Sequence, residues 1–472
     1  MMTKTSPHAS VLPRPRFRLP VMGDLLTLNF REPVMGTARE MDAYGGIVEK
    51  RIFNLRLIVI SRTDLIDEVN DESRWEKHVG HVLLNMRSLA GDGLFTAFND
   101  EPNWSKAHNI LMPAFTKAAM ASYHASMLDT AGELVSTWSQ HAADGTWVDI
   151  PGEANRLTTE MVARAGLGYS FTKLSDTSES PFNTAFLRGL KYAIGKVRTD
   201  ALPLYEQLLG RRGRNQHQRD TQYLREQVAA IIEARRNSDS RDDAAKDMLD
   251  IMLHETDPDT GERLDEANIV NQVMTLLIAG SETSANTIAF ALHYLATNPG
   301  MAAAARAEVD QRWPDRDIPE VSFDDVAKLR YLRRIVDETL RLWPIAPGYF
   351  RQAKTDTTLG EGRYRFTAGD RVFVFLVAAH RDRPWGDDAD QFNPDRFLPE
   401  NIRKLPPRIY KPFGTGSRAC IGRQFALHEI LLTLAMILHQ FTLEPYPGYQ
   451  LQVSETVSLK PKDLRLRLHR RP

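Results

Sequence analysis

Cys420, the only cysteine of the 472-residue chain, lies in the stretch Phe413-Gly414-Thr415-Gly416-Ser417-Arg418-Ala419-Cys420-Ile421-Gly422. The glycines on both sides of it allow the backbone to bend tightly around an atom that it must approach. From Ile421 to Leu438 apolar residues recur at mostly helical spacing, so Cys420 is predicted to lie where a loop passes into a helix. The dipole of that helix favours a thiolate over a thiol.

A single thiolate limits the metals, cofactors and covalent partners that this loop could bind. A zinc site needs three or four protein ligands, and a disulfide needs a second cysteine. A nucleophilic cysteine needs a histidine base, which the sequence does not locate. Haem iron needs one proximal ligand, and backbone N–H groups of such a loop would soften the charge on the sulfur. A buried structural cysteine is the usual fate of a lone cysteine and is the alternative.

Length and composition narrow the class of protein. The chain is long enough for one large domain, and 60 Lys and Arg against 61 Asp and Glu give a net charge of −1, which indicates no nucleic-acid partner. The single cysteine suits a reducing compartment. Residues 1–18 lack the apolar core of a signal peptide, and no stretch of about 18 apolar residues predicts a membrane span. We therefore expect a soluble, cytoplasmic protein.

The longest predicted helix starts at Asp265 and runs to about Thr297, where Asn298-Pro299-Gly300 ends it. Its length is roughly 48 Å at 1.5 Å per residue. Polar residues within it, such as Asn271 and Gln272, argue against a membrane span.

The middle of this helix contains Ala279-Gly280-Ser281-Glu282-Thr283. The small residues Ala279 and Gly280 would let a flat cofactor approach the backbone, and Gly280 could also allow a kink that admits water. Thr283 lies one turn beyond Ala279, on the same face. A hydroxyl and an acid beside a dry pocket are what proton delivery to bound oxygen needs.

Two further pairs occur at helical spacing. Trp104 and His108 are four residues apart and could jointly hold an anion, although core packing is the commoner role of such a pair. Glu338 and Arg341 are three residues apart and could form a solvated ion pair.

The remaining pattern is mostly helical. Strands are predicted at 56–60 and 371–376, Asp71–Lys77 forms a charged turn or helix end, and Ala90–Phe95 is a glycine-rich loop that ends on an aromatic residue. Residues from about 120 to 252 are predicted to be helical. Polar links interrupt them at Ser175–Ser180, Arg211–Arg214 and Asn237–Asp243.

The stretch Phe413–Gly422 resembles the haem-binding signature of the cytochrome P-450 superfamily, the haem-thiolate monooxygenases. Ala279–Thr283 matches the family's oxygen-activation motif. The family's W-x-x-x-[R/H] and E-x-x-R motifs are matched by Trp104 with His108 and by Glu338 with Arg341. The resemblance implies heme b with Cys420 as axial iron ligand. It further implies cofactor contacts by Phe413, Arg418, Trp104, His108, Lys77 and Gly422, and catalytic roles for Thr283, Glu282, Ala279 and Gly280.

The same resemblance implies a fold. We expect residues 1–472 to form a single haem domain, mainly α with a small β region, with the long helix over the haem and the cysteine loop leading into a helix. The family's E-x-x-R is buried and structural, and its third partner would be Arg396 within Phe392–Phe397, which matches the P-x-R-F motif. A Glu338–Arg341–Arg396 network is therefore predicted.

Beyond the superfamily, the chain is similar to the haem domains of bacterial fatty-acid hydroxylases that carry a fused reductase. That likeness implies insertion of one oxygen atom of O2 into a C–H bond of a fatty acid. Those enzymes anchor the carboxylate with an Arg and a Tyr on the first strands, where this chain has Leu55 and Val59, with Arg56 adjacent. Pocket residues carried over by position are Leu83, Met86, Phe95, Ala279, Ala346 and Val457.

Two other functions stay open. The substrate could be another hydrophobic molecule, such as a terpenoid or polyketide, or the chain could be a haem protein that binds a ligand without turnover. Glu282 and Thr283 argue against the second. No flavin or nicotinamide domain follows Pro472 in this sequence. Electrons would therefore come from a separate donor, a ferredoxin or a flavin reductase, unless the chain is a fragment of a fusion.

Overall fold

The structure is a computed structural model, and it describes residues 11–29, 31–53, 55–176, 180–200, 210–237, 246–315, 317 and 319–472. The residues fall into two compact units. The first unit comprises Met1–Gly80 and Glu338–Cys420, and the second comprises His81–Asp337 and Ile421–Pro472. Helix α14, Arg330–Leu342, crosses the boundary in sequence.

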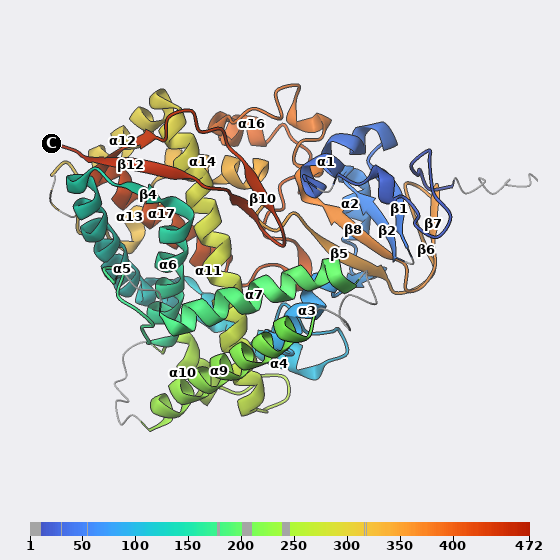
Figure 1. Ribbon diagram of the computed structural model, residues 1–472, viewed down its shortest axis with the longest axis horizontal. Helices are drawn as coiled ribbons and strands as arrows, with labels where there is room; N and C mark the ends of the chain where they lie inside the picture. The colour runs from blue at the N-terminus through green and yellow to red at the C-terminus, as the bar shows by residue number, and fades with distance from the viewer. Residues whose placement is uncertain are drawn as a thin grey trace, which may run out of the picture. The chain divides into compact units, whose positions relative to one another are not determined.

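The first unit is built on a five-stranded sheet of order β1-β2-β8-β5-β3. Strands β8 and β5, from the second segment of the unit, lie between the N-terminal strands β2 and β3, and Figure 1 shows blue and orange arrows side by side. The pair β2–β8 is parallel and the other pairs are antiparallel. Both predicted strands are present, as β2 and β8. The five strands are β1 Ile47–Ile52, β2 Leu55–Ile60, β3 Trp75–Lys77, β5 Gly348–Ala353 and β8 Arg371–Phe375.

The expectation of a charged turn or helix end over Asp71–Lys77 is wrong for its second half. Trp75–Lys77 is strand β3 and pairs with β5. Trp75 is fully buried and packs edge-on against Phe366 with the ring centroids 5.3 Å apart. The charged neighbours concealed this strand, because three residues are too few to show an alternating pattern.

Short helices and a hairpin complete the first unit. Apolar side chains of the sheet, of α2 and of the hairpin form one continuous core cluster. These elements are α1 Pro33–Glu40, α2 Thr63–Val69, β6 Thr357–Leu359, β7 Tyr364–Phe366, α15 Leu376–Ala379 and α16 Pro399–Ile402.

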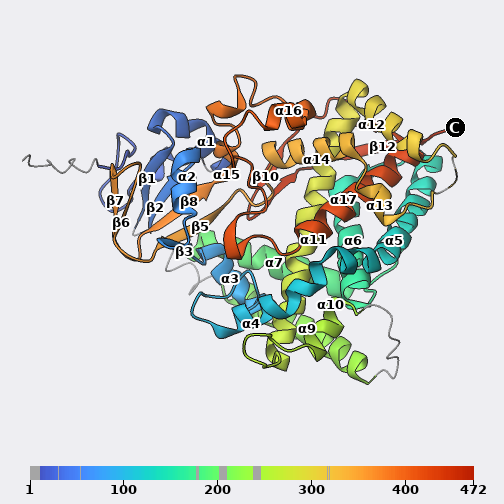
Figure 2. The ribbon, with the colours of Figure 1, turned by 180° about the vertical axis from the view of Figure 1, so that it is seen from behind.

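The second unit is organised around α11, Glu266–Thr297. Asp265 caps the helix by accepting a hydrogen bond from Asn268 N, so its predicted start and end are confirmed. Helices α6, Ile150–Met161, and α17, Arg423–Gln440, pack against α11 (Figures 1 and 2). Most of α11 is buried, which is why its sequence is apolar on more than one face.

The other elements of the second unit are helices and two small sheets. In sequence order they are α3 His81–Ala90, α4 Pro102–Leu111, α5 Lys117–Asp144, β4 Trp147–Asp149, α7 Pro181–Asp200, α9 Arg211–Arg236, α10 Met248–His254, α12 Pro299–Arg312, α13 Phe323–Val326, β9 Phe441–Pro445, β10 Val453–Glu455, β11 Leu459–Pro461 and β12 Arg465–Arg470. Strands β4, β12 and β9 form one antiparallel sheet, and β10 and β11 form a hairpin.

One of the polar links predicted between helices is wrong. Arg211–Arg214 is the first turn of α9, not a loop between helices. These residues are exposed, and the helix buries apolar side chains only further on, from Leu224 to Ile232. A cationic, glycine-containing first turn therefore gives no apolar periodicity. Residues 177–179 and 238–243 of the other two links lie outside the described residues.

None of the helices that the structure describes combines the length and the apolar character needed to cross a membrane.

Candidate functional site

The Cys420 loop is held in a folded-back conformation by its own backbone. Gly414 and Gly416 have φ values of +70° and +73°, which other residues rarely adopt. Cys420 N donates to Phe413 O at 2.9 Å, which closes the loop. Cys420 is exposed, and α17 begins three residues later at Arg423. The predicted loop-to-helix junction is confirmed.

Glu72 fixes the other side of this loop, and the sequence analysis missed it. Its Oε1 accepts from Ser417 N at 3.0 Å and from Ser417 Oγ at 2.9 Å. A Cβ at Gly416 would lie 2.4 Å from the same oxygen, so a larger residue there would displace the Glu72 carboxylate. The position of Glu72, 345 residues before Ser417, left no sequence signal for the contact.

The donor set fits a haem better than a bare metal ion. The described residues contain no group of three or more His, Cys, Asp and Glu side chains that could hold a metal ion. One exposed thiol, in a loop closed by the bond from Cys420 N to Phe413 O, is sufficient for an iron already held by a porphyrin. Phe413 is half-buried beside Cys420 in this loop, and Arg418 and Gly422 flank the cysteine in sequence.

The centre of α11 offers the second part of the predicted site. Ala279 is exposed, although its neighbours along the helix are mostly buried, so the backbone is open on one side. A flat ring fits beside such an alanine. Thr283 Oγ1 donates to Ala279 O at 2.7 Å, which leaves the hydroxyl lone pairs to accept a hydrogen bond. Glu282 Oε1 accepts from Ser458 Oγ at 2.9 Å.

Gly280 packs closely against a neighbouring segment of the chain. A Cβ at Gly280 would lie 2.7 Å from Val162 Cγ2, in the turn that follows α6. Its small size therefore allows close packing against the neighbouring helix, and Ala279 alone is the exposed small residue of the pair. The helix is continuous through this position.

The predicted anion-binding residues occupy both units. In the second unit, Trp104 and His108 share a face of α4 and stack with ring centroids 5.1 Å apart. In the first unit, Arg418 is in the Cys420 loop and Lys77 ends β3.

Arg351 was missed by the sequence analysis. It is only 4% exposed on β5, its Nε donates to Val69 O at 3.2 Å, and no carboxylate pairs with it among the residues that the structure describes. Burial lowers the pKa of its guanidinium. Lys77 lies directly opposite Arg351 in the β3–β5 ladder, so the two cations project from the same face. Two neighbouring cations, one of them buried, favour an anionic partner.

The predicted Glu338, Arg341 and Arg396 lie together in the first unit. Arg341 donates to both carboxylate oxygens of Glu338, at 2.6 and 2.8 Å, and both side chains are fully buried. Arg396 Nε lies 3.4 Å from Glu338 Oε1, within ion-pair distance but not aligned for a hydrogen bond. Arg341 also donates to the carbonyl oxygens of His380 and Ala389, which explains why a buried arginine is tolerated.

The predicted pocket residues differ in exposure. In the second unit Met86 is buried, Leu83 and Phe95 are half-buried, and Val457 lies half-buried in the turn between β10 and β11. In the first unit Ala346 is exposed.

The expected carboxylate anchor does not have the geometry of one. Arg56 is already engaged, because its Nε donates to Glu49 at 3.0 Å and its Nη1 to Asp370 at 2.6 Å. Leu55 is exposed and Val59 is buried in the sheet. A substrate carboxylate at Arg56 would compete with two carboxylates that already neutralise its charge.

A third residue that the sequence analysis missed is Asp92, in the loop after α3. Its carboxylate accepts hydrogen bonds from three amide side chains, Asn103 at 2.7 Å, Asn268 at 2.9 Å and Asn271 at 2.7 Å. These bonds join the loop that leads to Phe95 with α4 and α11. Burial alone would raise the pKa of Asp92, but the three amides hold it below the usual value.

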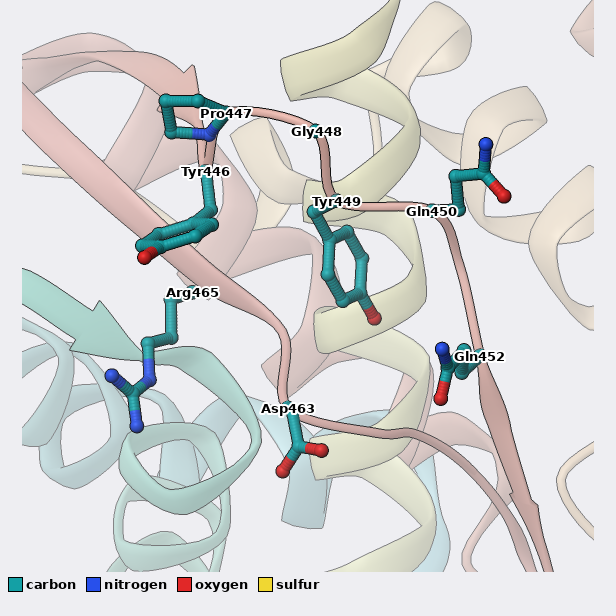
Figure 3. A pocket seen from close by; sticks show the side chains of 8 residues that line it. All are labelled: Tyr446, Pro447, Gly448, Tyr449, Gln450, Gln452, Asp463 and Arg465. Carbon is teal, nitrogen blue, oxygen red and sulfur yellow. The ribbon is translucent and has the colours of Figure 1, made fainter.

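A surface hollow of about 450 Å³ occurs in the second unit. Figure 3 shows that its lining comes from the segment after β9 and from the start of β12, with Tyr446, Tyr449 and Arg465 among the side chains. None of the predicted site residues lines it, so we do not assign it to the substrate.

The chain is similar in sequence to known proteins along nearly its whole length. The chain is 40% identical to a bifunctional cytochrome P450/NADPH–P450 reductase of Bacillus cereus over 97% of this chain and 42% of that protein. It is 38% identical to the bifunctional cytochrome P450/NADPH–P450 reductase 1 of Bacillus subtilis over 100% of this chain and 43% of that protein. The chain therefore spans less than half the length of these curated relatives.

A solved structure matches over nearly the whole chain. The crystal structure of a cytochrome P450, CYP102L1, superimposes with a TM-score of 0.92 and is 56% identical, covering 98% of this chain and 99% of that one. The predicted fold class, mainly α with a small β region, is thereby confirmed. The family model described as Cytochrome P450 matches residues 13–468, which include the Cys420 loop and the centre of α11, and the chain belongs to the cytochrome P450 family.

Proposed function

We propose that the chain is a haem-thiolate monooxygenase that hydroxylates a fatty acid. The observation that carries the proposal is the exposed Cys420 in a loop that closes on itself through Phe413, within a chain of the cytochrome P450 family. The curated relatives support the activity, since they are named as P450 proteins joined to NADPH–P450 reductases. This chain matches only part of each of them.

The cofactor of this proposal is heme b with Cys420 as its axial ligand. When bound, a thiolate-ligated haem supplies the electron density that favours cleavage of O2. Phe413 and Gly422 would shape the loop around the sulfur. The anionic groups of the cofactor would be held by cations and hydrogen-bond donors, for which Arg418, Trp104, His108, Lys77 and the newly found Arg351 are the candidates.

Residues at the centre of α11 would deliver protons during the reaction. Ala279 leaves its side of the helix open, and Gly280 keeps α11 packed against Val162. Thr283 has a hydroxyl that already donates to Ala279 O and can still accept a hydrogen bond. Glu282 would replenish the proton that Thr283 directs, acting as the acid of this pair.

The pocket would bind an apolar chain. Leu83, Met86, Phe95, Ala346 and Val457 supply apolar surface and no charge. Burial of each methylene group of a substrate favours binding by about 0.8 kcal/mol, which is about fourfold in affinity.

The pairing of Arg56 with Glu49 and Asp370 favours a second candidate function. If no cation near the first strands is available for a carboxylate, the substrate would be a hydrophobic molecule without one, such as a terpenoid or polyketide. The reaction and the residues of α11 would be the same.

The electron donor of this proposal is a flavin reductase that uses NADPH. The names of the relatives support it, since each joins a P450 to an NADPH–P450 reductase. A separate ferredoxin is the alternative. We propose a cytoplasmic location for the reaction.

The test is a titration of the purified ferric holoprotein with saturated fatty acids of increasing length. We expect a saturable low-to-high-spin shift of the Soret band, tightening up to about fourfold per methylene group. Cys420→Ala should remove the thiolate signature from the CO-difference spectrum. Primary alcohols of the same chain lengths are the matched ligands, and equal affinity for them would favour the second candidate.

Two outcomes would contradict the proposal. If the wild-type holoprotein lacked the thiolate signature, the haem-thiolate assignment would be wrong. If it bound other hydrophobic ligands but no fatty acid of any length, the substrate class would be wrong.

A further inference from the structure

Ser458 connects the carboxylate of Glu282 to the turn between β10 and β11. Its Oγ donates to Glu282 Oε1 at 2.9 Å and accepts from Asn286 Nδ2 at 3.4 Å. Glu282 and Asn286 lie one turn apart on α11, so the serine bridges two positions of the same helix face. Ser458 and Asn286 are buried, at 6% and 1% exposure.

The direction of this hydrogen-bond chain follows from its chemistry. The amide nitrogen of Asn286 can only donate, so the oxygen of Ser458 accepts from it. The one hydroxyl proton of Ser458 is then left for Glu282. The chain therefore runs from Asn286 through Ser458 to Glu282 and fixes one carboxylate oxygen as an acceptor. Bonds to a charged acceptor are the stronger kind.

The turn that carries Ser458 is short and internally bonded. Glu455 pairs with Leu459 at the end of the hairpin, which leaves three residues between them. Thr456 bonds to Ser458 O through both its backbone N, at 3.3 Å, and its Oγ1, at 3.2 Å. Val457 is the middle residue of this turn and is half-buried. A contact at Val457 is thus one peptide bond away from the hydroxyl that holds Glu282.

We propose that Ser458 is a positioning residue for Glu282. It holds the carboxylate in the orientation from which Glu282 supplies protons to Thr283, and it couples that orientation to the turn that meets the substrate at Val457. This inference rests on the proposed function. Without the hydroxyl, Glu282 would rotate away more often, and more of the O2 consumed would be reduced by the electrons of NADPH, with two protons, to hydrogen peroxide instead of giving product.

The experiment compares variants of the holoprotein supplied with NADPH through one surrogate reductase. Ser458→Ala should lower the product formed per NADPH about three- to tenfold, which is less than the roughly 10²–10⁴-fold that general acid–base catalysis contributes, because Glu282 itself is retained. Hydrogen peroxide should rise in proportion, and the solvent isotope effect on product formation should change. The CO-difference spectrum and the substrate-induced spin shift should stay as in the wild type. Ser458→Thr, which keeps the hydroxyl, should restore coupling.

Ser454→Ala is the matched control. Ser454 is on β10 of the same hairpin, opposite Lys460, and its side chain takes no part in the Glu282 chain. The positioning role is wrong if Ser458→Ala forms as much product per NADPH as the wild type. It is also wrong if Ser454→Ala loses as much product per NADPH as Ser458→Ala, or if Ser458→Thr does not recover the wild-type value. Thr283→Ala is the reference variant. If it forms as much product per NADPH as the wild type, the residues of α11 do not deliver protons, and the inference about Ser458 is wrong as well. A wild-type protein without the thiolate signature would instead overturn the proposed function.

Discussion

Glu429 on α17 is a carboxyl group that the fold buries completely. Neither of its oxygens has a hydrogen-bond partner among the residues that the structure describes. Burial raises its pKa well above the usual 4.5, and the nearby Ser284 offsets this only in part. The folded chain therefore keeps the proton at pH values where the unfolded chain releases it. Stability contributed by this group falls as the pH rises above 4.5.

Glu429→Gln should remove this dependence, because an amide does not titrate. Relative to the wild type, the unfolding free energy of the variant should increase by about 1.4 kcal/mol for each pH unit above 4.5, up to the pKa in the folded state. The measurement is urea unfolding of both proteins at pH 5, 6 and 7. Glu226→Gln, at an exposed position of α9, is the control for the loss of a carboxyl group. A constant difference between Glu429→Gln and the wild type across this range would contradict the prediction.

Arginines of the first unit show why residue type alone does not assign a role. Arg56, the expected substrate anchor, has two carboxylate partners, and Arg351, which no motif marked, is buried with none among the described residues. A cation that already has partners has little to gain from a ligand. A buried cation without a carboxylate gains most from one.

At the scale of elements, Asp92 joins three segments of the second unit. The loop that carries it lies so close to α11 that a Cβ at Gly93 would be 1.9 Å from Thr275 Oγ1 and one at Gly91 would be 2.3 Å from the Asn271 side chain. The carboxylate then takes amide donors from both α4 and α11. Asp92 thus helps to position α4, which carries Trp104 and His108, together with the bonds of Asn109 to Asp257 and Asp259.

Asp92→Ala should destabilise the second unit by about 2–4 kcal/mol, because three amide groups lose a charged acceptor. The same variant should lose haem faster, since α4 carries two of the proposed cofactor contacts. Urea unfolding and the rate of haem transfer to an acceptor protein measure the two effects. Asp100→Ala changes an exposed aspartate eight residues further on and serves as the control. Unfolding of Asp92→Ala at the wild-type midpoint would show that the loop is held by packing alone.

At the scale of the whole molecule, three buried histidines make stability depend on pH. Burial lowers the pKa of His293 to about 4, of His380 to about 3 and of His428 to about 4. Each is neutral in the folded chain at a pH where the unfolded chain takes up a proton near 6.5. The stability that they contribute is present above pH 6.5 and is lost as the pH falls towards 4. Glu429 acts in the opposite direction over part of this window.

We therefore expect the wild-type protein to lose stability steeply between pH 6.5 and 4.5. Each of the three histidines contributes about 1.4 kcal/mol per pH unit, and Glu429 offsets about one of them. The midpoint of urea unfolding, followed by tryptophan fluorescence, measures the loss. His293→Gln should reduce the slope by about 1.4 kcal/mol per pH unit. A midpoint that stays level or rises on acidification would contradict this account.

Much of the fold and part of the candidate site followed from local patterns in the sequence. The Cys420 loop, the start of α11 at its Asp265 cap and the strands β2 and β8 are each decided by residues within a few positions of one another. The strand β3 and the first turn of α9 did not follow, because three residues or one exposed turn carry no periodicity.

The sequence by itself determined that one cysteine would lie in a glycine-bent loop before a helix, because backbone angles and helical periodicity are local properties. Only the tertiary structure decided which charged and small residues have partners. Arg56 and Asp370 are 314 positions apart, Glu72 and Ser417 are 345 apart, and Gly280 is small because Val162 packs against it. Such partners come together only when distant segments fold against each other, and burial then makes each pairing, or its absence, energetically large.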